Sequence, residues 1–321
     1  MTSAPLGTSL PEALSLGDAI DLGAAWVTKV AADRGIRILI IKGAGLAHHG
    51  LRAPRISADV DVLVDPARFD DFCELLIDEA WRIRPITAVG AEWSGHSVTF
   101  IRDDWPCDID AHRYFPGFLA GAQTAFDALW RDRTTMLLAN RSVQIPDRNG
   151  SILVAALHHL RDGASRSTIG GELDQLVSVE MTPDELGSLA ALAVETGALG
   201  PVAHVLEQLG LEPAAIPQIE DSPALRAWNS RIAADASGPY FWLLLLRNTP
   251  ARHRPSLIAR AIWPSRADIE INNPGTPDSR SARAKVRLTR IPKGLRSLPR
   301  AIRALRASPP DHDSMTKVSD R

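Results

Sequence analysis

Two pairs of aspartates alternate with apolar residues in the first part of the chain. Asp59 and Asp61 lie in "DVDVLV", and Asp108 and Asp110 lie in "DIDAH". Residues two apart on a strand point to the same face, so each pair would present both carboxylates together. Such a pair is tolerable if water covers it, if Lys or Arg pairs with it, or if a divalent cation neutralises it. The pattern alone leaves open a solvated edge strand and a metal site.

The segments around these acids predict an α+β sheet module. Apolar periodicity predicts helices over 10–34 and from residue 66 onward, and β-branched runs predict strands at 36–42, 59–64, 96–102 and 107–115. We expect strand 59–64 to lie beside strand 107–112, because three carboxylates can share metal ions only from neighbouring strands. Such a cluster needs one of Asp108 and Asp110, and the spacing does not choose between them.

The second half of the chain is helical in pattern and shows no second sheet. We therefore expect a domain at 1–148 that holds the sheet and an N-terminal helix, followed by a helical domain at 149–264. Residues 265–321 contain the linker-like "NNPGTPDSRS" at 272–281 and continue as a basic tail.

Composition narrows the class of protein. The hydrophobic content of 45% supports a folded core, and the two cysteines are too few for a disulfide framework. No apolar run approaches the ~20 residues that span a bilayer. The first residues lack the basic start and apolar block of a secretion signal. These features predict a cytoplasmic protein without integral membrane association.

The net charge of −2 conceals a strongly basic tail. Residues 280–310 contain ten Lys and Arg and no Asp or Glu, which leaves −12 for the remainder of the chain. The spacing from Leu298 predicts a short basic amphipathic helix. Such a tail could contact nucleic acid or an anionic membrane, or its Leu and Ile could dock on the acidic body, and we expect docking or partial disorder rather than nucleic-acid binding. No aromatic residues interleave with the charges to stack on bases, so we do not expect a nucleic-acid partner.

Three ordered motifs resemble a known family. They are "KG" at Lys42 and Gly43, the strand "DVDVLV" preceded by Arg55 and Ser57, and "DIDAH". Together they resemble the nucleotidyltransferases of the DNA polymerase beta superfamily, in the branch of uncharacterised nucleotidyltransferase-like proteins. The resemblance covers about residues 36–178. It implies a polymerase-beta-like nucleotidyltransferase mixed sheet with flanking helices, followed by a helical domain.

The resemblance also implies roles for individual residues. The catalytic residues, which would bind Mg²⁺ or Mn²⁺, are Asp59, Asp61 and Asp110. The residues on the nucleotide side are Lys42, Gly43, Arg55 and Ser57. Possible contacts to substrate are Asp108 and His112. Lys42 would offer its charge to phosphate or pair with an acid of the cluster. The usual Gly-Ser or Gly-Gly pair is Gly43-Ala44 here, which removes a hydroxyl that would bind phosphate.

The implied activity is metal-dependent nucleotidyl transfer. The enzyme would move a nucleoside monophosphate from a nucleoside triphosphate to a small-molecule or peptide acceptor and release pyrophosphate. Two alternatives stay open from the residues. One is a non-catalytic module of the same fold that binds a nucleotide or a partner. The other is a glycosyltransferase that binds a nucleotide sugar and a metal through an Asp-any-Asp strand end.

Overall fold

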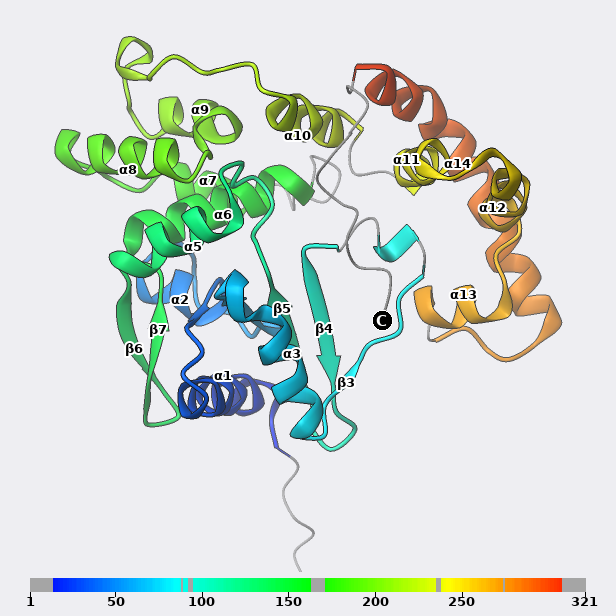
Figure 1. The fold of residues 1–321 in the computed structure, drawn as a ribbon, viewed down its shortest axis with the longest axis horizontal. Coiled ribbons are helices and arrows are strands. Elements are labelled where there is room, and N and C mark those ends of the chain that lie inside the picture. The colour runs from blue at the N-terminus through cyan, green and yellow to red at the C-terminus, as the bar shows by residue number, and fades with distance from the viewer. Residues whose placement is uncertain are drawn as a thin grey trace, which may run out of the picture.

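The computed structural model describes residues 14–87, 89–91, 95–162, 171–234, 238–273 and 275–307 (Figure 1). The strands are β1 (Ile38–Ile40), β2 (Asp59–Val64), β3 (Arg82–Ile83), β4 (Ser97–Ile101), β5 (Asp108–His112), β6 (Thr134–Leu138) and β7 (Arg141–Ile145). The helices of the first half are α1 (Leu16–Asp33), α2 (Gly43–His48), α3 (Phe69–Asp78) and α5 (Ala122–Arg131). The helices of the second half are α6 (Arg148–Asp162), α7 (Glu172–Val177), α8 (Pro183–Glu195), α9 (Leu199–Gln208), α10 (Pro223–Ala233), α11 (Gly238–Asn248), α12 (Arg254–Ile262), α13 (Arg266–Asn272) and α14 (Arg280–Ala307).

The main sheet is mixed and has the strand order β1-β2-β5-β4-β3. β2 and β5 are parallel neighbours, and the other pairings in this sheet are antiparallel. β6 and β7 form a separate antiparallel pair. The α+β fold and the predicted adjacency of strands 59–64 and 107–112 are therefore confirmed.

The two faces of the main sheet are buried against different helices. On one face, Val60, Val62 and Ile109 pack in a core with α1 and α3. On the other face, Leu39 and Leu63 pack in a core with α5, α6, α8 and α9. Asp59 and Asp61 share the face of Leu63, because side chains alternate along a strand. The carboxylates therefore lie on the α6 side of the sheet, before the point where helices cover it.

The second half of the described chain is helical, as expected from its sequence. The core that contains Leu63 extends through α6 and α8 to Trp228 in α10, so residues on both sides of position 148 share it. The predicted boundary falls at the first residue of α6. The division into two domains stays a prediction.

The basic tail is more regular than its sequence suggested. One helix, α14, begins at Arg280 and continues through Pro292 and Pro299 to Ala307. Ala301 and Ala304 are buried against Tyr240 and Phe241 of α11, and this packing stabilises the helix despite the two prolines. In the stretch from Leu298, Leu305 also packs against this core, whereas Leu288 and Leu295, which precede that stretch, are exposed. No helix in the described ranges is both long and apolar enough to cross a bilayer.

Candidate functional site

The parallel pairing of β2 with β5 sets the four aspartates opposite one another. Asp59 is in register with Asp108, and Asp61 is in register with Asp110. We call Asp61 and Asp110 the inner acids, because they lie further along each strand, towards the helix-covered end. We call Asp59 and Asp108 the outer acids. The sequence predicted that these strands are neighbours, but their register comes only from the structure.

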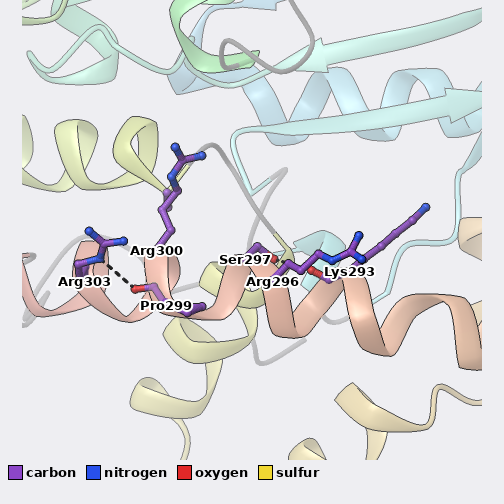
Figure 2. Close-up of a pocket in the computed structure, with 7 residues that line it drawn as sticks. Lys293, Arg296, Ser297, Pro299, Arg300 and Arg303 are labelled. Carbon is purple, nitrogen blue, oxygen red and sulfur yellow. Dashed lines mark hydrogen bonds between the residues drawn. The ribbon is translucent and has the colours of Figure 1, made fainter.

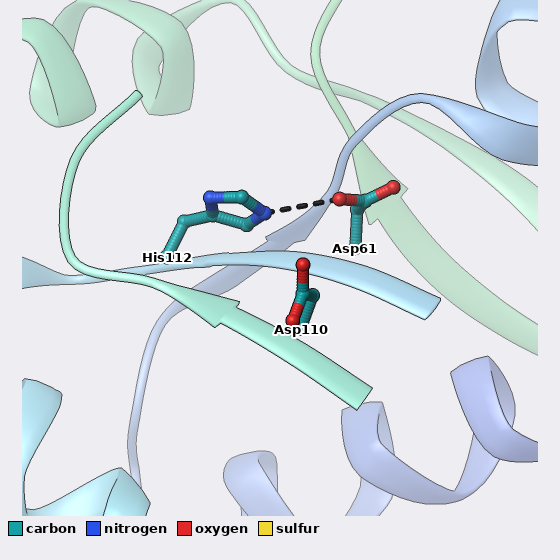
Figure 3. Close-up of side chains that lie close together, drawn as sticks. All are labelled: Asp61, Asp110 and His112. Atoms are coloured by element: carbon teal, nitrogen blue, oxygen red, sulfur yellow. Dashed lines mark hydrogen bonds and ion pairs between the residues drawn. The ribbon is translucent and has the colours of Figure 1, made fainter. Parts of the chain in front are cut away.

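The inner acids meet a histidine from the end of β5. Ligand atoms of Asp61, Asp110 and His112 lie within 4.8 Å of one another, and within the described residues this is the group with metal-ligand geometry (Figure 3). Figure 3 shows the His112 ring directed at Asp61, with the Asp110 carboxylate beside them. The structure therefore brings together Asp61 and Asp110, two of the three predicted acids, with His112, whereas Asp59 is not part of this group.

Asp61 is buried and held by two partners. The Nζ of Lys42 lies 2.5 Å from Asp61 Oδ1, and His112 Nε2 lies 3.0 Å from the same oxygen. Burial alone would raise the pKa of Asp61, but the charge of Lys42 and the hydrogen bond from His112 hold the pKa well below its ordinary range. Asp61 is therefore a permanent carboxylate, as a metal ligand must be.

Lys42 reaches Asp61 from an unusual backbone conformation. It lies between β1 and α2 with φ of 60° and ψ of −149°, a region that non-glycine residues rarely occupy. Gly43 follows with φ of 47°, and a Cβ there would meet no atom within 4 Å. Strain of about 1–3 kcal/mol at such a residue is typical of functional sites. The open space at Gly43 lets a ligand approach the backbone.

The outer acids have different environments. Burial, and then the negative charge of Asp61, raise the pKa of Asp59 to about 6. Asp108 forms an ion pair with Arg84, a partly exposed residue just beyond β3. Burial raises the pKa of Asp108, and Arg84 opposes that rise. The outer acids are thus closer to solvent than Asp61, and Asp108 has a cationic partner of its own.

Asp110 accepts a hydrogen bond from a neighbouring strand. The hydroxyl of Thr99 on β4 donates to Asp110 Oδ1. Thr99 lies opposite Asp110 in the antiparallel β4–β5 ladder. This contact orients the Asp110 carboxylate without bringing a charge to it.

A second histidine, which was not predicted from the sequence, packs beside His112. His96 is buried, and its ring centroid lies 5.5 Å from that of His112. Arg161 of α6 has Nη1 3.1 Å from His96 Nε2. A guanidinium can only donate, so His96 Nε2 accepts and the ring is neutral. Burial, and then the charges of His112 and Arg161, lower the pKa of His96. His96 lies outside the acid motifs, so no local pattern marked it.

The two other predicted nucleotide-side residues lie in the segment that enters β2. Arg55 is exposed, and Ser57 is half-buried two residues before Asp59. Neither belongs to a strand or helix. Their roles on the nucleotide side stay predictions.

A family model described as "Uncharacterised nucleotidyltransferase" matches residues 24–186, about half of the chain. This range contains β1, β2 and β5, and therefore all four aspartates. No curated protein sequence matches the chain.

Several solved structures are similar to this one. The antibiotic-resistance factor ANT(2'')-Ia is 12% identical, with a TM-score of 0.32, over 61% of this chain and 90% of that chain. An antigenic nucleotidyltransferase-like protein from Paracoccidioides brasiliensis is 13% identical, with a TM-score of 0.38, over 62% of this chain and 97% of that chain. A tRNA-processing enzyme in an apo form is 15% identical, with a TM-score of 0.26, over 92% of this chain and 91% of that chain. These likenesses are remote, and no site assignment rests on them.

Proposed function

This chain belongs to the family of uncharacterised nucleotidyltransferases, which makes it a transferase, and we propose that it transfers a nucleoside monophosphate in a reaction that depends on Mg²⁺ or Mn²⁺. The donor is a nucleoside triphosphate, and the acceptor is a small molecule or a peptide. The observation that carries the proposal is the parallel pairing of β2 with β5, which sets Asp61 opposite Asp110. The family favours this reaction over transfer from a nucleotide sugar.

The carboxylates fit a hard divalent cation. Mg²⁺ and Mn²⁺ prefer oxygen ligands, and Asp61 and Asp110 have carboxylate oxygens within 4.8 Å of each other. Asp59 is close enough for the charges of Asp61 and Asp110 to raise its pKa. Asp61 and Asp110 would hold the ion, and Asp59, the third acid that the sequence predicted, would border it. The bound ion would neutralise the triphosphate and increase the acidity of an acceptor hydroxyl.

His112 supports the metal site by orienting Asp61. Its Nδ1 is buried and has no hydrogen-bond partner among the described residues, whereas Nε2 contacts Asp61 Oδ1. We therefore place the ring proton on Nε2 and not on Nδ1, so that the Nε2–H group donates a hydrogen bond to the Asp61 carboxylate. The imidazole then fixes one oxygen of Asp61 and leaves the remaining lone pairs for the ion.

Lys42 takes the place of a cation at Asp61 when no nucleotide is bound. Its ammonium contacts the carboxylate directly, and its side chain is largely buried. We expect binding of the metal and the triphosphate to transfer this ammonium from Asp61 to a phosphate oxygen. The two roles that the sequence allowed for Lys42 would then belong to two states of one site.

The transfer itself requires a displacement at the α-phosphorus. The acceptor oxygen forms a bond to that phosphorus, the bond to the bridging oxygen of the β-phosphate breaks, and pyrophosphate leaves. The proton of the acceptor passes to a carboxylate of the cluster. The open space beside Gly43 is where the triphosphate can approach the backbone of the chain.

The proposal is tested by incubating the protein with each of the four nucleoside triphosphates, Mg²⁺ and a panel of small molecules and peptides. We expect one acceptor to gain the mass of a nucleoside monophosphate while pyrophosphate appears in equal amount. A parallel sample in chelator should show neither product.

The compartment that we predict for this activity is the cytoplasm.

Calorimetry separates the remaining outcomes. In one outcome, the protein binds the triphosphate tightly only when the divalent ion is present and yet releases no pyrophosphate with any acceptor. That result would show a nucleotide-binding module of the same fold instead of an enzyme. Equal binding in chelator would contradict the metal site.

A further inference from the structure

The outward face of α14 is both apolar and basic. Leu288 is 59% exposed, Ile291 is 37% exposed and Leu295 is 62% exposed. At about 100° per residue, these three side chains fall within about 60° of one another around the helix. We call them the apolar stripe. Ala301 and Ala304, which pack on α11, lie on nearly the opposite side, so the stripe faces away from the body.

Cations border the apolar stripe on both sides. By the same helical spacing, Lys285, Arg296 and Arg303 lie on one side of it, and Arg280 and Arg287 lie on the other. The helix contains no acidic residue from Arg280 to Ala307. An exposed apolar row between two basic rows is the pattern of a helix that lies flat on a membrane surface.

A basic pocket lies beside α14, between the side that carries Arg296 and Arg303 and the side that packs on α11. It has a volume of about 350 Å³ and is lined by Lys293, Arg296, Arg300 and Arg303, together with Ser297, Pro299 and Ala234. Figure 2 shows these basic side chains spaced along one stretch of the helix, with Arg300 directed away from its axis. Several phosphate groups could be bound there, because each cation offers its own donors.

An exposed tryptophan extends the apolar surface beyond α14. Trp263, which follows α12, is 53% exposed. The Arg287 guanidinium lies 4.8 Å from the centre of its ring and donates to the carbonyl of Pro264. Ile262 precedes Trp263 and is also exposed. Tryptophan is enriched where a protein meets the headgroup layer of a bilayer.

We propose that α14 and Trp263 form a peripheral docking surface for an anionic phospholipid bilayer. The headgroup phosphates would contact the flanking cations, among them Arg296 and Arg303 at the near edge of the basic pocket, while the apolar stripe enters the interface between headgroups and acyl chains. A nucleic acid would match the cations, but it would leave Leu288 and Leu295 in water. A second copy of the chain would bring an acidic body, but the apolar stripe would need an apolar surface opposite it. Only the bilayer offers anionic groups for the cations and an apolar layer for the apolar stripe.

The test uses the full chain and sedimentation with vesicles. One set of vesicles is phosphatidylcholine alone, and the other is phosphatidylcholine mixed with phosphatidylserine. We expect the protein to partition onto the mixed vesicles at least tenfold more strongly, and the binding to weaken as salt is added. Equal partition onto both sets, or onto neither, would overturn the proposal.

Two pairs of variants separate the apolar and the basic contributions. Leu288→Ser with Leu295→Ser should reduce partition at least tenfold, and Leu137→Ser, at an exposed position of β6, is the control. Arg296→Glu and Arg303→Glu should each reduce it about fivefold or more, since a cation near the surface contributes about 1 kcal/mol and 1.4 kcal/mol is tenfold. Arg141→Glu, at the exposed first position of β7, is the matched control. Thermal melts should show each variant folded, because all these side chains are exposed.

Two further measurements distinguish the other occupants. Fluorescence anisotropy with a single-stranded oligonucleotide should show weak binding that the leucine substitutions leave unchanged. Tight oligonucleotide binding without vesicle binding would replace the bilayer by a nucleic acid. Size-exclusion chromatography should show no concentration-dependent dimer that the leucine substitutions abolish, and such a dimer would assign the stripe to a second copy.

Discussion

The inner and outer acids occupy adjacent positions on the same two strands, yet their surroundings differ. Asp61 is buried and bonded to Lys42 and His112, and Asp110 accepts from Thr99. Asp108 pairs with a half-exposed Arg84, and the pKa of Asp59 is raised to about 6. Two residues along β2 therefore separate a buried carboxylate, held by Lys42 and His112, from one closer to solvent, whereas Asp108 and Asp110 on β5 are both half-buried and differ in their partners.

The difference follows from the position of each residue relative to the covered end of the sheet. Leu63 and His112, beyond the inner acids, are buried, and Leu63 packs in the core that contains α6. Deeper residues have less water around them, so an acid there requires fixed partners. The comparison indicates that the inner acids form the centre of the site and that the outer acids border it.

Removal of an inner acid should have the largest effect on stability. Asp61→Ala leaves the buried Lys42 ammonium and the His112 ring without their shared acceptor. We expect a loss of about 3–5 kcal/mol in the free energy of unfolding, measured by urea denaturation. Asp108→Ala, the matched change in the outer row, should cost about 1 kcal/mol or less, because its partner is half-exposed. Equal losses of unfolding free energy for the two variants would show that the inner and outer acids do not differ in their contribution to stability.

The second prediction concerns the pH dependence that Asp59 contributes. Its pKa in the folded protein is about 6, above its ordinary value, so the folded state binds the proton more tightly than the unfolded state. Stability should therefore fall as pH rises from about 4 to about 6, and the loss should persist above that window. Asp59→Asn should raise the free energy of unfolding by about 1–2 kcal/mol at neutral pH, after a discount for solvent screening.

Thermal melts in chelator measure this effect. The asparagine variant should be the more stable protein at pH ~8 and should match the wild type at pH ~3, where both side chains are neutral. A variant that is less stable than the wild type at pH ~8 would show that the Asp59 carboxylate has a favourable partner in the folded state.

The smallest effect is expected at the partner of the outer acid Asp108. Arg84→Gln removes its ion pair at a half-exposed site, and such pairs contribute about 0–1 kcal/mol. A double-mutant cycle with Asp108→Asn should give a coupling energy below about 1 kcal/mol that shrinks as salt is added. A larger coupling that does not depend on salt would place Asp108 in a buried network like that of Asp61.

The alternation of aspartate and valine was sufficient to predict β2 and its two faces. The same alternation predicted β5, because Ile109 and Ala111 are buried on one side of that strand. The choice between Asp108 and Asp110 required the register of two strands about fifty residues apart. Register depends on the packing of the whole sheet, which a single sequence does not display.

Other features depended on contacts between distant segments. His96 and Arg161 meet only after α6 packs over the sheet, so no local motif contained both. The length of α14 was underestimated because proline usually ends a helix. Burial of Ala301 and Ala304 against α11 offset that local preference.

The central claim is that the inner acids hold the ion that binds the triphosphate, and one calorimetric comparison tests it. A non-hydrolysable nucleoside triphosphate with Mg²⁺ is titrated into the wild type, Asp110→Asn and Asp108→Asn. Asp110→Asn keeps an acceptor for Thr99 but removes a ligand charge, so binding should weaken about 10–100-fold. Asp108→Asn should change the affinity by no more than about threefold. The account is contradicted if Asp110→Asn binds like the wild type, or if Asp108→Asn weakens binding as much as Asp110→Asn does.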